Sequence, residues 1–197
     1  MLPENLPIAL TPFAFLIGEW RGTGYVSYPN PTDSDAEPFE FEFEQQVTFE
    51  PGVGEILTYR AETRDSSGTG LASECGYWTL SKGPLGELGP GLLPATGESM
   101  VTVREDLELH RNASGGFDIQ ALIIQSSGIC ELYFGEIGSG RAELATDAVL
   151  RSPTAGEYAA GRRLFGLVEG ELLWAWDMAA LGLPMGSHAS AKLRRIS

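Results

Sequence analysis

Hydrophobic and polar positions alternate most clearly between Phe39 and Glu50. Phenylalanine or valine fills most odd-numbered positions of this stretch, whereas glutamate or threonine fills most even-numbered ones. Because successive side chains of a strand point to opposite faces, the pattern predicts a strand with one buried and one solvated face. The Pro-Gly-Val-Gly sequence that follows predicts a turn into an antiparallel neighbour.

Shorter runs of the same kind recur along the chain, and turn signals rich in glycine, serine and asparagine separate them. They predict strands at residues 18–28, 39–50, 56–63, 71–80, 100–109, 117–124, 129–137, 142–150, 158–168 and 172–178, with a basic strand after residue 188. A threonine at position 11 and a proline at position 12 predict a short apolar helix over residues 12–17 that ends at Gly18.

These elements predict an all-β fold. With few helix signals and no strand-helix-strand spacing, the pattern favours an antiparallel up-and-down β-barrel of ten strands with a short N-terminal helix. A β-sandwich ranks lower, because closure into a barrel removes the exposed edge strands. Barrels of this size enclose a ligand cavity. The inward positions Leu172, Trp174 and Trp176 predict that its wall is apolar and bulky.

The first predicted strand contains an unusual run of glycines after one large aromatic residue. Gly18 opens it, and Trp20, Gly22 and Gly24 then share one face because side chains alternate. Two glycines on one face of a strand indicate a bend or a close approach of another backbone segment. Loose packing beside one buried tryptophan is the alternative interpretation of the same spacing.

Length and composition narrow the class of protein. The 197 residues are predicted to form one domain, with a loop insertion around residues 83–115 where Gly, Pro and Leu recur without a period. The 13 basic and 27 acidic residues give a formal charge of -14, which argues against nucleic acid and anionic membranes as partners. Only Cys75 and Cys130 occur and no signal peptide is recognisable, so a cytoplasmic location is expected.

The chain contains none of the common catalytic motifs, so its two histidines are the main candidates for chemistry. His110 ends a charged segment beside a turn, which is typical of a solvated residue at the rim of a barrel. His188 lies where a loop gives way to the basic strand near the C-terminus. It is either a packed or solvated side chain or a metal ligand, and imidazole is a common axial ligand of haem iron.

Two separated segments together resemble the nitrobindin family, whose shape is related to that of fatty-acid-binding proteins and lipocalins. The first is the glycine and tryptophan pattern from Gly18 to Gly24, which follows a short apolar segment. The second is a strand, a Leu-Pro loop, His188 and a run of Ala, Lys, Leu and Arg. Similar short segments begin at Glu74, Ser127 and Pro153, and the resemblance covers most of the chain outside residues 83–115.

The resemblance implies a ten-stranded barrel that holds haem b, with His188 as the axial ligand of the iron. It further implies a ferric iron that binds nitric oxide and converts peroxynitrite to nitrate by isomerisation. At two cofactor contacts the chain departs from the family pattern, with Asn30 where members often have Thr and Gly156 where they often have Lys. Asn30 is retained as a candidate cofactor contact.

Two alternatives remain at the level of the sequence. One is a barrel of the same shape that has lost haem and carries a fatty acid or another small apolar molecule, and the other is a domain without a ligand. A homodimer is expected whichever of these functions the barrel has. The ligand role also requires that His188 lie in a loop or turn, because in a regular strand it would face away from Ala189.

Overall fold

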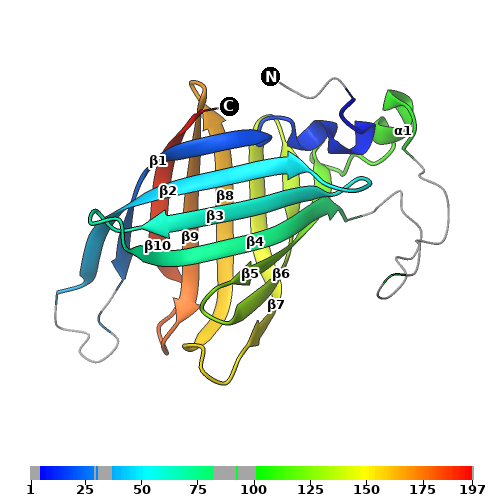
Figure 1. Ribbon diagram of the computed structural model, residues 1–197. Helices are drawn as coiled ribbons and strands as arrows, with labels where there is room; N and C mark the ends of the chain where they lie inside the picture. Colours follow the sequence, from blue (N-terminus) through cyan, green and yellow to red (C-terminus); the bar gives the residue numbers. More distant parts are fainter. Residues whose placement is uncertain (1–4, 29, 31–36, 82–91, 93–100, 197) are drawn as a thin grey trace.

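Ten antiparallel strands close into a barrel in the computed structural model, which describes residues 5–28, 30, 37–81, 92 and 101–196 (Figure 1). Consecutive strands are neighbours, and the first strand pairs with the tenth, so that no edge is left open. The strands are β1 (Gly18–Tyr28), β2 (Phe39–Pro51), β3 (Leu57–Arg64), β4 (Gly70–Leu80), β5 (Phe117–Gln125), β6 (Ile129–Gly138), β7 (Arg141–Arg151), β8 (Tyr158–Val168), β9 (Glu171–Ala180) and β10 (Gly186–Arg195). The predicted fold class is confirmed.

The predicted strand at residues 100–109 is wrong over its described part. This segment forms the short helix α1 (Arg104–Glu108), in which Leu107 is buried, whereas the flanking Leu109 is exposed. The Asp106 carboxylate accepts hydrogen bonds from the backbone N–H groups of Thr102 and Val103, at 2.9 and 3.0 Å. A side chain that satisfies the free N–H groups at its N-terminus stabilises a helix over a strand. Most of the predicted insertion lies outside the described residues, and the single domain stays a prediction.

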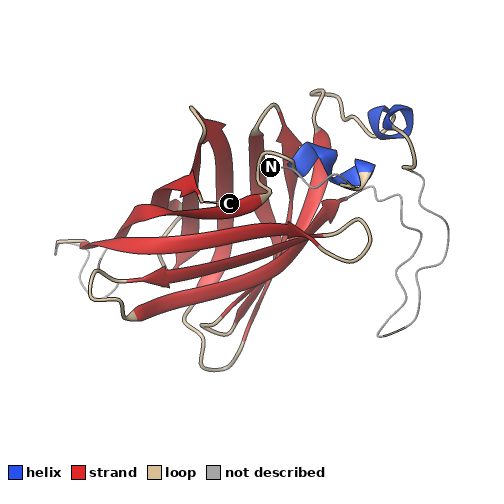
Figure 2. Ribbon diagram, turned by 45° about the horizontal axis from the view of Figure 1, so that its top comes forward, coloured by secondary structure: helices blue, strands red, loops and turns tan. Residues whose placement is uncertain are grey.

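The N-terminal helix begins and ends four residues earlier than predicted. It is the 3-10 helix η1 (Ile8–Phe13), which buries Leu10 and Phe13 and has Pro12 inside it rather than at its start. Bonds between residues three apart, such as Leu10 N–H to the Pro7 carbonyl at 2.9 Å, hold it together. Helix η1 contacts α1, and the two lie together at one end of the barrel (Figures 1 and 2).

Strand β1 fixes this end of the barrel. Trp20 is fully buried and donates a hydrogen bond from Nε1 to the Leu16 carbonyl at 2.7 Å. The Arg195 guanidinium lies 4.2 Å from the centre of its ring and also contacts the carbonyls of Phe15 and Ile17. Arg195 therefore ties β10 to the segment that precedes β1.

The glycines of β1 allow its neighbours to approach. A Cβ atom at Gly22 would lie 2.1 Å from the Lys192 carbonyl oxygen, and one at Gly24 would lie 2.2 Å from a ring carbon of Phe43. Gly18, with a φ of 134°, adopts a backbone conformation that favours glycine. The run from Gly18 to Gly24 thus shapes the seam where the barrel closes.

Candidate functional site

A cavity of about 290 Å³ lies in the barrel lumen, near the end of β1 and the start of β10. Its wall is mostly apolar and aromatic and includes the predicted positions Trp174 and Trp176. A second hollow of about 340 Å³ adjoins it, since Tyr28 and His188 line both. Together the two hollows are within the size range of small-ligand sites.

A β-bulge turns His188 into this cavity. In the pairing of β10 with β9, Ser187 lies opposite Asp177 and Ala189 lies opposite Trp176, so that His188 is an extra residue between them. A bulge redirects side chains, and both His188 and Ala189 line the lumen cavity. The expected loop or turn before the strand is therefore wrong in detail, because His188 lies within β10.

The His188 imidazole is held between two aromatic rings. Its ring centre is 5.5 Å from that of Tyr28 and 5.3 Å from that of Trp176, which it meets edge to face. Its Nδ1 atom is buried and has no hydrogen-bond partner among the described residues. Burial, and next the positive charge of Arg163, lower the pKa of His188. The ring is therefore neutral near pH 7, which is the form that binds a metal.

A buried ion pair crosses the lumen beneath His188. Arg163 on β8 donates two hydrogen bonds to the Glu74 carboxylate on β4, at 2.8 and 2.7 Å, and both residues line the cavity. The Tyr59 hydroxyl donates a further bond to Glu74 at 2.7 Å. Burial alone would raise the pKa of Glu74, but the charge and hydrogen bonds of Arg163, together with the hydrogen bond from Tyr59, more than offset this, so that the pKa is lowered and the carboxylate is charged.

A second carboxylate, Glu131 on β6, joins the same group. Arg163 donates a hydrogen bond to it at 3.3 Å, the Tyr158 hydroxyl at 2.5 Å and the Gln125 amide at 2.8 Å. The Tyr133 hydroxyl also donates to it, and burial raises the pKa of both tyrosines. We call Glu74, Glu131 and Arg163 the floor cluster. Sequence reasoning missed it, although Glu74 shares the inward face of its strand with Trp78, and Glu131 shares that of its strand with Tyr133.

The remaining candidates lie at different distances from the cavity. Asn30 is half-buried and follows Tyr28, the cavity residue at the end of β1, by two positions. A Cβ atom at Gly156 would meet only Leu181, which lines the adjoining hollow, at 4.0 Å. His110 does not line either hollow and instead contacts the Asp106 carbonyl through Nδ1 at 2.9 Å.

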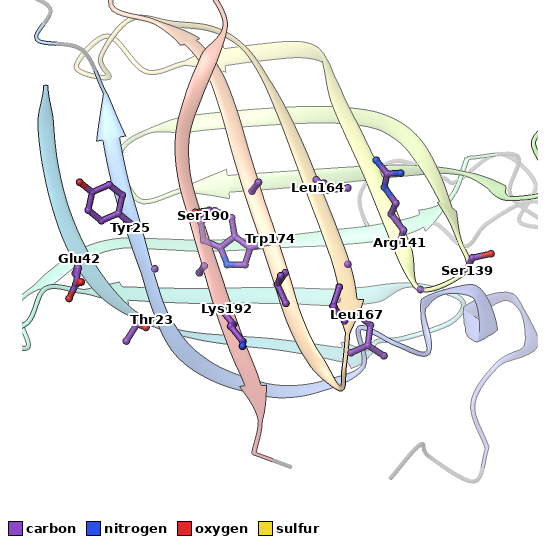
Figure 3. A pocket seen from close by; sticks show the side chains of 17 residues that line it. Thr23, Tyr25, Glu42, Ser139, Arg141, Leu164, Leu167, Trp174, Ser190 and Lys192 are labelled. Carbon is purple, nitrogen blue, oxygen red and sulfur yellow. The ribbon is translucent and has the colours of Figure 1, made fainter.

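A larger hollow of about 780 Å³ lies on the outer face of the barrel, over β1, β10, β9 and β8 (Figure 3). The exposed side chains of Tyr25, Leu164 and Leu173 make it apolar. Among the described residues that line it there is no histidine or cysteine. The lumen cavity, which combines a neutral imidazole with enclosing walls, is the better site for chemistry.

The fold and the lumen cavity define a small barrel of the ligand-binding type, whose cavity contains one neutral imidazole among the described residues. Residues 9–195 match the sequence profile of the family described as "THAP4-like, heme-binding beta-barrel domain". The chain belongs to this nitrobindin family of haem-binding barrels, which confirms the resemblance.

Known relatives cover nearly the whole chain. A protein named peroxynitrite isomerase from Kocuria rhizophila is 44% identical over 201 residues, covering 99% of this chain and 94% of that protein. Another of the same name, from Leifsonia xyli subsp. xyli, is 43% identical over 197 residues, with 98% of each chain covered. The crystal structure of Rv2717c from M. tuberculosis is 26% identical with a TM-score of 0.68, covering 96% of this chain and 98% of that one.

The residues of the cavity fit a haem. His188 presents a neutral ring whose buried Nδ1 has no hydrogen-bond partner in the part of the chain that the structure describes, and aromatic side chains flank it. The hollow continues past His188 toward Met178 and Leu183, which extends the apolar surface available to a flat macrocycle.

No helix in the described part of the chain is long and apolar enough to cross a membrane.

Proposed function

We propose that this protein binds haem b through His188 and isomerises peroxynitrite to nitrate. The observation that carries the proposal is the bulge in β10, which turns a neutral imidazole into an apolar lumen. The names of the relatives, at 44% and 43% identity over nearly the whole chain, support the same reaction. Asn30, near the end of β1, is proposed as a further cofactor contact.

The reaction requires little acid-base chemistry from the protein, because peroxynitrite and nitrate contain the same atoms and carry the same charge. Bound haem would supply an iron that polarises the O–O bond of peroxynitrite. His188 would hold that iron from one side. The aromatic rings of Tyr28 and Trp176 flank the imidazole, restrict its orientation and limit the access of water to it. We also propose that the iron of the haem-loaded protein would bind nitric oxide.

Reconstitution with haemin tests the proposal. We expect the wild-type protein to give a shifted Soret band and a stoichiometric complex, and His188→Ala to lose both. His110→Ala removes the other histidine, which lies outside the cavity, and should bind as the wild type does. Stopped-flow mixing then compares peroxynitrite decay with that caused by free haemin. An unchanged Soret band in His188→Ala, or equal decay rates, would contradict the proposal.

The departures at Asn30 and Gly156 favour a second candidate, a haem-free carrier of a fatty acid or another small apolar molecule. The apolar wall of the lumen suits such a ligand. Mass spectrometry of ligands extracted from the freshly purified protein separates the two functions. A bound lipid without haem would favour the carrier.

We also infer a cytoplasmic location and a homodimer. Cys75 and Cys130 are free thiols, as is usual in a reducing compartment. The outer hollow has apolar side chains that lie between two ion pairs, Lys192 with Glu171 and Arg141 with Glu143. Because each pair offers both a positive and a negative group, the same face of a second copy can pair with it about a two-fold axis. Sedimentation velocity of the purified protein measures the oligomeric state.

A further inference from the structure

We propose that Glu74 sets the ligand specificity of the haem-free lumen, which takes an uncharged apolar molecule and excludes a fatty-acid anion. Glu74 is a carboxylate of the chain itself, and it occupies the place that a ligand carboxylate would need beside Arg163 and Tyr59. The inference rests on the second candidate of the proposed function, the carrier of a small apolar molecule. It narrows the chemistry of the ligand that this carrier would hold.

Arg163 and Tyr59 are the two groups of the lumen cavity best suited to bind a carboxylate. Both line the cavity, and they are only 5% and 4% exposed. A guanidinium binds a carboxylate through two parallel hydrogen bonds. The Tyr59 hydroxyl keeps its proton because burial raises its pKa, so that it can donate as well. Without Glu74, these two groups would hold the anionic head group of a fatty acid.

Glu74 already uses both of these donors. Its Oε2 atom accepts hydrogen bonds from the Tyr59 hydroxyl at 2.7 Å and from Arg163 Nη1 at 2.8 Å, and its Oε1 atom accepts one from Arg163 Nη2 at 2.7 Å. Arg163 Nε donates to the Tyr133 hydroxyl at 3.0 Å, and Nη2 donates also to Glu131 at 3.3 Å. All three guanidinium nitrogens thus have protein partners, and a second carboxylate would have to displace Glu74 to reach them.

The other polar groups of the wall offer no positive charge to an anion. The Gln45 amide donates to the Thr63 hydroxyl at 3.0 Å, and its carbonyl oxygen accepts from Trp174 Nε1 at 2.8 Å. Among the described side chains of the cavity wall, only His188 and Trp176 have a buried polar atom without a partner, and both are uncharged. Moving an ionised carboxylate from water into such a cavity costs far more free energy than moving an uncharged head group.

Isothermal titration calorimetry of the apoprotein at pH 7 with 1-octanol and with sodium octanoate tests the inference. The two probes have the same number of carbon atoms and differ in the charge of the head group. We expect the wild type to bind 1-octanol about tenfold or more tightly than octanoate. Glu74→Ala frees the donors of Arg163 and Tyr59, so that its affinity for octanoate should rise about tenfold while its affinity for 1-octanol changes little.

Glu62→Ala is the matched control. The Glu62 side chain is 40% exposed, is paired with Arg60 and Arg64, and does not line the lumen cavity. Its substitution changes the net charge of the protein by the same amount, and both affinities should equal those of the wild type. An equal gain of octanoate affinity in Glu62→Ala would show that net charge, and not the site beside Arg163, governs the selection.

The outcomes separate the inference from the carrier function. A wild-type protein that binds neither probe overturns both. Octanoate bound by the wild type as tightly as 1-octanol, or an unchanged octanoate affinity in folded Glu74→Ala, overturns the inference alone. If Glu74→Ala fails to fold, as judged by far-UV circular dichroism, Glu74→Gln takes its place. It keeps the shape of the side chain but leaves Arg163 without this charged partner, and it should raise the octanoate affinity too.

Discussion

Two residues show what a single side chain can and cannot reveal in a sequence. Trp20 was predictable as a packed residue, since its spacing from Gly22 and Gly24 places all three on one face of a strand. Nothing in that spacing indicates a reactive group. His188 was predicted as a ligand from its residue type and the family pattern, and the structure places it in the lumen cavity. Its orientation was not predictable, because regular alternation turns it away from Ala189 and only the bulge brings both into the lumen.

Trp20→Ala should destabilise the apoprotein by ~3–5 kcal/mol, the usual cost of emptying a large buried site. The side chain is fully buried, its Nε1 bonds to Leu16, and Arg195 lies over its ring. Guanidinium unfolding followed by circular dichroism measures the loss. Val53→Ala, at a position 94% exposed, serves as the control. Equal stability of the Trp20 variant and the wild type would mean that this residue does not organise the barrel.

At the scale of the element, the bulge in β10 is the feature that makes a strand into a binding site. Deleting Ser187 should restore regular pairing, place His188 opposite Asp177 and turn its ring away from the lumen. We expect such a protein to keep its far-UV circular dichroism spectrum and to lose the Soret band after reconstitution. Ser187→Ala keeps the residue count and should bind haem normally. Retained haem binding in the deletion variant would contradict the role assigned to the bulge.

The strands themselves were largely predictable from alternation and turn residues, because each has one buried and one solvated face. The exception at residues 100–109 has a local cause. Side-chain capping by Asp106 favours a helical turn there, and in the described part of the segment only Val101 and Leu107 are buried hydrophobic residues. The bulge could not be predicted from the sequence. Its extra residue is His188 rather than a glycine, and the pairing of β10 with β9 is regular on both sides of it.

At the scale of the whole molecule, the floor cluster links three strands across the lumen: β4 through Glu74, β6 through Glu131 and β8 through Arg163. Alternation predicts which positions face inward but does not say which of them meet across a barrel. Glutamates are so frequent on the outer faces of this chain that two inward ones do not stand out. The cluster therefore became visible only in the folded arrangement.

The cluster should make stability depend on pH. Arg163 lowers the pKa of Glu74 in the folded chain below its usual value of 4.5, although burial opposes this shift. Its stabilising contribution is therefore complete above pH 4.5 and is lost as pH falls through the lowered pKa. Urea unfolding at pH 7, 5, 4 and 3 should show a smaller acid loss for Glu74→Gln than for the wild type. Parallel pH profiles of the two proteins would contradict the assignment.

The pairing of β1 with β10 has a consequence for the order of events during folding. The strand that closes the ring is also the strand that bears His188, and it is the last of the ten barrel strands to be synthesised. Until it docks, β1 and β9 are open edges, and the lumen has no imidazole to offer. Contacts between segments so distant in sequence form slowly. Closure of the ring and capture of the cofactor are therefore expected to be a single late event, in which a nascent barrel of nine strands holds no haem.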